Sequence, residues 1–191
     1  MKRADLIHQV NSLGLEVFTV SDLRRVFPAE SNLRHSIKRL KDAQSIISVT
    51  RGYYRLAERS IDVEKFATQL YYPSYISFET VLSKHGVINQ GTYTISLATT
   101  RHSKKVTVDG IDCVYSQLKQ ALFFGFRLVD GVYLADVEKA LLDELYLIVL
   151  GKRKINFEEW DCKQLNKTKI KQYASSYPSA VKKLLARLGL V

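Results

Sequence analysis

The chain is poor in cysteine and in long apolar runs, and each shortage excludes a class of protein. Its 191 residues contain two cysteines, Cys113 and Cys162, too far apart to form a Cys-x-x-Cys pair. Two cysteines so placed support neither a disulfide framework nor a cysteine-built zinc site. The longest apolar run is Leu145–Leu150, whereas a membrane-spanning helix needs about 20 residues. The basic start also lacks the apolar stretch of a signal peptide, so we expect a cytoplasmic protein with no membrane partner.

The sequence also lacks the short motifs that mark common enzymes. It contains no G-x-G-x-x-G, no G-x-x-x-x-G-K-[ST] and no H-E-x-x-H. The histidines lie in four separate segments, without the spacing of metal ligands: His8, His35, His85 and His102. Several charged residues share one predicted helix: Asp136, Glu138, Lys139, Asp143 and Glu144. The helix dipole favours the acidic residues in the first turn, and the side chains of the adjacent Glu138 and Lys139 point apart. We therefore predict that the protein is not an enzyme and that it binds no cofactor and no metal.

Positive charge is abundant and unevenly distributed. The chain has 29 Lys and Arg against 19 Asp and Glu, a net charge of +10. Residues 1–60 carry net +5 and residues 151–191 carry net +7, whereas residues 61–150 carry net −2. Basic ends of this kind are typical of proteins that bind a polyanion. The alternative is that the charges only keep the protein in solution.

The first 60 residues carry the signals of three helices. Apolar residues recur at helical spacing in the first, at Leu6, Ile7, Val10 and Leu13, and Gly14 can end it. Ser21 is a candidate N-cap for a second helix over Asp22–Val26, which stops before Pro28. Ser31 is a candidate N-cap for a third helix from Asn32 to about Ala43.

A predicted hairpin follows these helices. Ile46, Ile47 and Val49 form a strand, Arg51 and Gly52 a tight turn, and residues 53–56 a second strand. Three helices followed by a small hairpin is the order of a winged helix-turn-helix. We therefore predict a DNA-binding domain of this kind over residues 1–60.

The third helix has one apolar face, formed by Leu33, Ile37 and Leu40, and a polar face opposite. Arg and Lys suit phosphates and guanine, and Asn suits adenine. The predicted DNA-binding residues are those of the polar face and the turn: Ser31, Asn32, Arg34, His35, Lys38, Arg39, Arg51 and Tyr53. The alternative is a solvated basic helix in an ordinary helical domain.

A polar linker at Ala57–Asp62 leads to a second region with mixed signals. Helices are predicted over 63–70, 77–85 and 137–150, with Ser77 and Asp136 as N-caps. A strand is predicted from Tyr93 to Leu97. Asp-Gly pairs at 109–110 and 130–131 predict two hairpins, because both turn residues need a positive φ. We therefore predict an α+β protein, with a mixed α/β domain of hairpins and C-terminal helices over residues 61–191.

The end of the chain is basic and predicted to be helical, with one helix over Pro178–Leu188. Its lysines form a candidate second surface for a polyanion: Lys163, Lys167, Lys169, Lys171, Lys182 and Lys183. Lys167, Lys169 and Lys171 are spaced by two and cannot all share one helical face. A solvated tail is the alternative.

Four stretches occur in order within residues 72–150: Tyr72–Ile88, Ala98–Arg101, Phe123–Gly125 and Ala135–Asp143. Through these stretches residues 72–150 resemble the AbiEi family of bacterial antitoxins, and Gly52–Leu56 resembles the end of that family's wing. The resemblance implies an antiviral-defence antitoxin of a type IV toxin–antitoxin system. Its winged helix would bind inverted repeats in its own promoter and repress transcription. Its second domain would oppose a nucleotidyltransferase-like toxin without a stable complex, with RNA as a further candidate partner.

Two other functions are compatible with the same residues. One is a winged-helix transcription factor whose second domain senses a small ligand. The other is a nuclease-like enzyme that the winged helix delivers to DNA. The motif residues themselves can have folding roles, for example Phe78, Val81 and Leu82 in packing a helix on the sheet.

Overall fold

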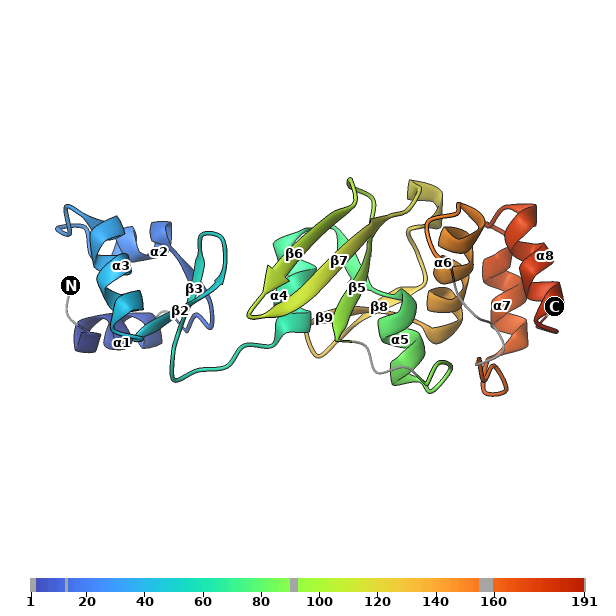
Figure 1. Cartoon of the computed structure of the whole chain (residues 1–191), viewed down its shortest axis with the longest axis horizontal. Coiled ribbons are helices and arrows are strands. Elements are labelled where there is room, and N and C mark those ends of the chain that lie inside the picture. Colours follow the sequence, from blue (N-terminus) through green and yellow to red (C-terminus); the bar gives the residue numbers. More distant parts are fainter. Residues whose placement is uncertain (1–2, 13, 90–92, 155–159, 191) are drawn as a thin grey trace. The chain divides into compact units, whose positions relative to one another are not determined.

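A computed structural model describes residues 3–12, 14–89, 93–154 and 160–190. The chain forms a mixed α/β structure that divides into two compact units (Figure 1). Unit 1 comprises Met1–Val63 with Thr107–Gly110, and unit 2 comprises Glu64–Val106 with Ile111–Val191. Each unit is described separately below.

Unit 1 combines helices with a small sheet. Its elements are α1 (Arg3–Ser12), β1 (Phe18–Thr19), α2 (Val20–Val26), α3 (Leu33–Asp42), β2 (Ile46–Thr50) and β3 (Tyr53–Leu56). The sheet has the order β1-β3-β2, with both pairs antiparallel. A register shift between Ser48 and Thr50 leads into the turn before β3. The helices and the hairpin therefore follow one another as the sequence predicts.

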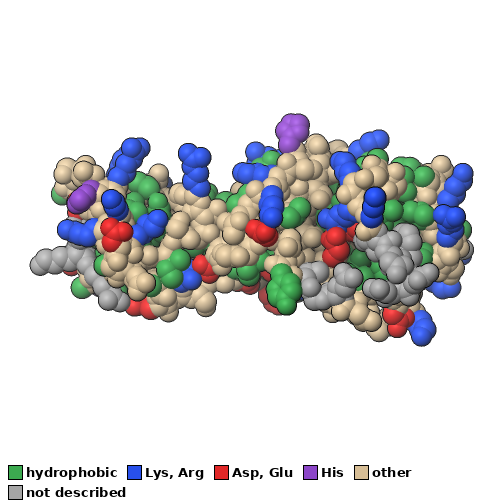
Figure 2. Space-filling model, viewed as in Figure 1, with side chains coloured by type: hydrophobic (Ala, Val, Ile, Leu, Met, Phe, Trp, Pro, Cys, Tyr) green, Lys and Arg blue, Asp and Glu red, His purple; other side chains and the backbone are tan. Residues whose placement is uncertain are grey.

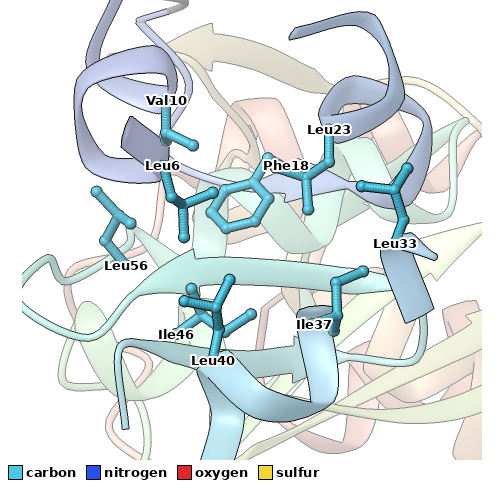
Figure 3. Packing of buried hydrophobic residues seen from close by; sticks show 9 residues of the cluster. All are labelled: Leu6, Val10, Phe18, Leu23, Leu33, Ile37, Leu40, Ile46 and Leu56. Carbon is cyan, nitrogen blue, oxygen red and sulfur yellow. The ribbon is translucent and has the colours of Figure 1, made fainter. Parts of the chain in front are cut away.

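One apolar cluster holds unit 1 together (Figure 3). Leu6 and Val10 of α1, Leu23 of α2 and Phe18 of β1 point into the same core. The cluster also receives α3 and the hairpin through Leu33, Ile37, Leu40, Ile46 and Leu56. Burial of each side chain of this size stabilises the folded state by about 1.5–3 kcal/mol. The apolar face of each helix therefore determines which side packs into the core. Of the apolar positions predicted for the first helix, Leu13 lies outside the described residues.

Two N-caps differ from those that the sequence predicts. The α2 cap is Thr19, not Ser21, because Thr19 and Asp22 form a capping box: Asp22 N donates to Thr19 Oγ1 and Thr19 N donates to Asp22 Oδ2. The α3 cap is Asn32, not Ser31, because Asn32 Oδ1 accepts a hydrogen bond from His35 N at 3.2 Å. Several polar residues precede each helix, and only backbone geometry selects the one that caps.

Unit 2 is built on a six-stranded mixed sheet of order β6-β7-β5-β4-β9-β8. Its strands are β4 (Ser74–Ile76), β5 (Thr94–Thr99), β6 (Lys104–Val108), β7 (Ile111–Gln117), β8 (Phe126–Val129) and β9 (Val132–Ala135). β4 runs antiparallel to β5 and parallel to β9, and β5 runs parallel to β7. Both predicted Asp-Gly turns have positive φ at each residue, from 47° at Asp109 to 85° at Gly110. The hairpins are as predicted.

The helices of unit 2 are α4 (Val63–Leu70, beginning at the last residue of unit 1), α5 (Phe78–Lys84), α6 (Val137–Val149), α7 (Lys167–Ala174) and α8 (Ser179–Arg187), with a 3-10 turn, η1 (Gln120–Leu122). The predicted ranges of α4, α5, α6 and α8 match within a few residues, whereas α7 lies in the basic end for which helical structure was predicted without bounds. α6 packs against α5, α7 and α8, so every residue from Glu138 to Leu147 is buried. Within the described residues, no helix is long and apolar enough to cross a bilayer.

Two details differ from the sequence-based expectation. The strand predicted to start at Tyr93 begins at Thr94, and the Tyr93 side chain is 96% exposed. Asp136 occupies the N-cap position of α6 but does not cap it with its side chain. Its carboxylate instead accepts a hydrogen bond from the Tyr173 hydroxyl of α7 at 2.9 Å. Contacts with α7 therefore replace the local cap.

Candidate functional site

The polar face of α3 is the first candidate site. Leu33, Ile37 and Leu40 are buried in the unit 1 core, as the helical spacing predicts. The predicted contact residues of this helix are all exposed: Arg34, His35, Lys38 and Arg39. The buried side chains anchor the helix, so the cationic side chains stand on a rigid support. Side chains of this kind can contact phosphates or base edges.

The two residues that precede α3 differ in role from the cations on its polar face. Ser31 and Asn32 are both exposed. The Asn32 side-chain oxygen is already engaged as the helix cap. A bidentate contact with adenine needs both the oxygen and the nitrogen of the amide, so base recognition by Asn32 competes with capping. The structure thus gives this residue a folding role that the sequence pattern did not reveal.

The turn between β2 and β3 presents one further cation. Arg51 is exposed, and Gly52 has a φ of +85°, a conformation that favours glycine. Tyr53 and Tyr54 are each partly buried, and the Tyr54 ring lies 6.2 Å from the Phe18 ring in the core cluster. Strand alternation predicts that one of the two tyrosines packs inward, and that residue is Tyr54. Arg51 is therefore the exposed cation of this turn.

The C-terminal helices present most of the predicted second basic surface (Figure 2). The exposed lysines of this region are Lys163, Lys167, Lys171, Lys182 and Lys183. Lys169 is different, because its Nζ lies 2.9 Å from Asp136 Oδ2 and 3.6 Å from Glu138 Oε2. It joins α7 to the start of α6. We therefore define the C-terminal basic surface as these five exposed lysines, and Lys169 is not part of it.

Three of the segments that carry the AbiEi resemblance, Tyr72–Ile88, Phe123–Gly125 and Ala135–Asp143, meet around a buried ion pair. Lys139 and Asp143 of α6 are paired, and neither side chain is exposed. Asp143 Oδ2 accepts hydrogen bonds from the Tyr75 hydroxyl at 3.0 Å and the Ser77 hydroxyl at 2.8 Å. Lys139 Nζ and Asp143 Oδ1 each lie 2.7 Å from the hydroxyl of Tyr177, which precedes α8. Both charged groups are therefore satisfied inside the protein.

The Phe123–Gly125 stretch closes this cluster. Lys139 Nζ lies 5.1 Å from the centre of the Phe124 ring. Gly125 has a φ of +71°, and a Cβ there would lie 3.1 Å from the Lys139 side chain. A larger residue would both strain the backbone and crowd the lysine. Burial lowers the pKa of Lys139, whereas burial, with the charge of Asp143, raises the pKa of Tyr75 well above its usual value.

A second buried charge lies one residue further along α6. Glu144 is buried, and its Oε2 accepts a hydrogen bond from Arg153 Nη1 at 2.6 Å. The same arginine also pairs with Glu79 of α5. Burial, together with the negative charge of Glu79, raises the pKa of Glu144 to about 8. Arg153 thus links the end of α6 to α5.

Both clusters contain residues that the sequence pattern did not mark. Lys139 and Asp143 are one helical turn apart, which is the visible signal for an ion pair. Tyr75 and Tyr177 lie more than 30 residues away from Lys139 in the sequence, and no local spacing identifies them. Among the described residues, no group of three or more His, Cys, Asp or Glu side chains could hold a metal ion.

Comparison with known proteins gives a likeness in structure but none in sequence. No protein-family model matches the chain, and no curated protein sequence matches it. The fold, however, has a solved counterpart. The crystal structure of the RV2827C protein from Mycobacterium tuberculosis is similar to this chain, with a TM-score of 0.60, and the match covers 93% of this chain and 72% of that one. The two sequences are 10% identical, so the likeness to RV2827C shows a shared fold alone.

Proposed function

We propose that unit 1 is a winged helix-turn-helix that binds operator DNA in the promoter of its own operon and represses it. The observation that carries this proposal is the division of α3 into a buried apolar face and an exposed cationic face. In this arrangement α3 is the recognition helix, and the β2–β3 turn is the wing, with Arg51 at its tip. The element order and the antiparallel β1-β3-β2 sheet support it.

Phosphate contacts supply the affinity in this proposal. Arg34, Lys38 and Arg39 contact the backbone or guanine edges, and Arg51 contacts a phosphate beside the groove. A dimer on inverted repeats would place two recognition helices about one helical turn apart, roughly 34–36 Å. Binding should therefore depend steeply on salt concentration.

The second part of the proposal is an antitoxin activity in unit 2, directed against a nucleotidyltransferase-like toxin in the cytoplasm and without a stable complex. It is supported by the AbiEi resemblance, three of whose motif segments contribute residues around the Lys139–Asp143 pair. Because that pair is fully buried, the motif residues around it have a role in stabilising the fold. The antitoxin activity therefore has to come from the exposed surface of unit 2. The C-terminal basic surface is the proposed working surface.

A gel shift with a fragment of the operon's own promoter tests the first part. We expect the full chain to retard the fragment at low salt, and binding to fall linearly on a logarithmic plot as salt rises. An unrelated fragment of equal length is the control, and its affinity should be weaker by at least about 10³-fold. Equal affinity for both fragments would contradict operator recognition.

A nuclease is the weaker alternative for unit 2. Its candidate acid and base groups on α6 include Lys139 and Asp143, and both have no exposed side-chain surface. Groups in that position reach no phosphodiester bond in solution. Incubation of a labelled promoter fragment with the protein and Mg²⁺ should leave the fragment uncut.

A further inference from the structure

A small aromatic pocket opens on unit 2 beside the first residues of β4. It is lined by Tyr72, Pro73, Ser74, Phe123, Phe126 and Tyr133. Its volume is about 60 Å³, well below the roughly 300–1,000 Å³ of pockets that enclose a drug-sized ligand. A space of this size is too small to enclose a metabolite, but its aromatic lining can contact one face or edge of a flat ring.

Two walls of the pocket, Phe123 and Phe126, are packed against a buried tyrosine. The Phe126 ring is stacked on the Tyr75 ring, with 4.3 Å between their centres and 14° between their planes. Phe123 lies 5.0 Å from the same tyrosine. Tyr75 is held by its hydrogen bonds to Asp143 and Lys139. The buried ion pair therefore orders the aromatic wall, and a ring that enters the pocket meets little ordering cost.

The residues next to the pocket carry positive charge. The Arg101 guanidinium lies 4.2 Å from the centre of the Tyr71 ring, and its Nη1 donates to the carbonyl oxygen of Tyr72 at 3.3 Å. Lys104 Nζ lies 5.1 Å from the centre of the same ring. Both cations are exposed, and Tyr72 itself is 65% exposed. Arg101 thus contacts the backbone of Tyr72, a residue that lines the pocket, and Lys104 lies beside the ring of the preceding residue, Tyr71.

We propose that this pocket stacks one base of a single-stranded nucleic acid, with the neighbouring phosphates on Arg101 and Lys104. A base supplies the flat ring, and its strand supplies the negative charge that the two cations favour. Stacking on tyrosine and phenylalanine tolerates every base, because each has a π face. An aromatic residue of a protein partner would fill the pocket but would leave the two cations without a counter-charge.

This site lies entirely in unit 2, so it rests neither on operator binding by unit 1 nor on the neutralisation of a toxin. It is also separate in sequence from the C-terminal basic surface. Base stacking and phosphate pairing involve no sugar hydroxyl, so RNA and single-stranded DNA share the chemistry. The experiment therefore includes both strands as separate arms.

The test uses the full chain and a six-nucleotide strand with 2-aminopurine at one internal position, as RNA and as DNA. Stacking on an aromatic side chain quenches the fluorescence of this base. We expect quenching on binding, and an affinity at least about fivefold lower for Tyr72→Ala. The matched control is Tyr93→Ala, which removes the exposed tyrosine before β5 and should leave binding unchanged. Thermal melts verify that each variant is folded.

Two further variants separate this site from unit 1. The double variant Arg101→Gln with Lys104→Gln should bind the strand with a weaker salt dependence. The slope of log affinity against log salt concentration should fall in magnitude by about 0.7 for each phosphate that these cations neutralise in the parent. Lys41→Ala, at an exposed cation of unit 1 to which no contact is assigned, should leave the quenching intact. Quenching with RNA alone would assign the site to RNA, and equal quenching would assign it to either strand. Absence of quenching, or quenching that Tyr72→Ala retains in full, would overturn the proposal.

Discussion

Lys139 and Asp143, four residues apart on α6, form an ion pair in which neither side chain is exposed. An ion pair taken out of water is stabilising only if further hydrogen bonds satisfy its remaining donors and acceptors. Here the hydroxyls of Tyr75, Ser77 and Tyr177 do so, and they come from separate parts of the chain. The pair therefore joins β4, α6 and the segment before α8 in one cluster.

Loss of the lysine should destabilise unit 2 strongly. Lys139→Met leaves Asp143 as a buried negative charge, which is expected to cost about 3 kcal/mol of unfolding free energy. Three hydroxyls still donate hydrogen bonds to Asp143 in the variant, so we expect a cost near the lower end of the range for a broken buried ion pair. Urea denaturation followed by Trp160 fluorescence measures it, because this is the one tryptophan of the chain.

The matched control for that variant is Lys84→Met. It breaks the Lys84–Glu64 ion pair, in which both side chains are partly exposed. Pairs of this kind contribute about 0–1 kcal/mol, so the change should be small. Equal effects of Lys139→Met and Lys84→Met on the unfolding free energy would show that the buried pair is not a structural centre.

The stability of unit 2 should depend on the protonation of Glu144. Its pKa is raised to about 8 in the folded protein, against an ordinary value of 4.5. Between those two values the folded state holds a proton that the unfolded state releases, so stability falls as pH rises from about 4.5 to about 8. Arg153 and Glu79, which face this carboxyl, and Asp143 nearby are the other charges that act on it.

Glu144→Gln should remove this contribution. The unfolding free energy of the variant should change less with pH, by up to about 1.4 kcal/mol per pH unit between about pH 5 and pH 8. Glu64→Gln, at the partly exposed partner of Lys84, is the control and should keep the parent's slope. Urea midpoints measured at several pH values across this range are sufficient. Parallel profiles for the parent and Glu144→Gln would contradict the assignment.

Local patterns in the sequence predict much of this fold. Apolar spacing predicts the buried face of α3, and the Asp-Gly pairs predict both hairpins with their positive φ values. These signals depend on residues close together in the chain, where steric rules decide the conformation. The predicted N-caps of α2 and α3 were wrong by one or two positions, because the neighbouring side chains at Thr19 and Asn32 offer the same chemistry.

Contacts between distant segments are what the sequence does not predict. Tyr177 meets Lys139 across 38 positions, and Lys169 meets Asp136 across 33. Nothing in the spacing of lysines distinguishes Lys169 from its exposed neighbours, since the tertiary position of α7 decides which one finds a carboxylate. The aromatic pocket has the same origin, because its walls come from β4, β8, β9 and the residues just before β4 and β8.

Recognition of the operator by α3 should be separable from capping of the helix. Asn32→Ser keeps a hydroxyl that can cap α3 but removes the amide, whereas Asn32→Ala removes both. We expect Asn32→Ser to lower discrimination between operator and unrelated DNA more than it lowers affinity. Lys38→Ala should instead weaken binding to all DNA sequences. It should also lower the magnitude of the slope of log affinity against log salt concentration by about one. Gel shifts at two salt concentrations measure both effects, and unchanged shifts for both variants would rule out this docking.

The turn of the β2–β3 hairpin should contribute one phosphate contact. Arg51 is exposed at its tip, so Arg51→Glu removes the contact and adds a repelling charge. The binding free energy should weaken by an amount on the order of 1 kcal/mol or more. Lys119→Glu, an equal charge reversal at an exposed position of unit 2, is the control and should affect operator binding less. If Arg51→Glu binds operator DNA as well as the parent, the turn does not touch it.

Repression and antitoxin action should be separable by changes to the C-terminal basic surface. Lys171, Lys182 and Lys183 are exposed, so their reversal to Glu should leave the fold intact. Lys169 is excluded from this set, because its replacement would break the ion pair with Asp136 and destabilise unit 2. Co-expression with the proposed nucleotidyltransferase-like toxin, followed by growth, measures antitoxin action, and a promoter–reporter fusion measures repression.

We expect the triple reversal to repress the reporter normally and to fail to restore growth, with an unchanged thermal melt. Its control is Lys169→Met, which should lower the melting temperature but leave the other basic side chains in place. This contrast distinguishes removal of a working surface from a drop in stability, since only the first abolishes rescue while the protein remains folded. Full rescue by the triple reversal would show that the basic residues are a solvated surface. The antitoxin activity, if present, would then have to come from another face of unit 2, and the Tyr72 pocket with Arg101 and Lys104 would be the next surface to alter.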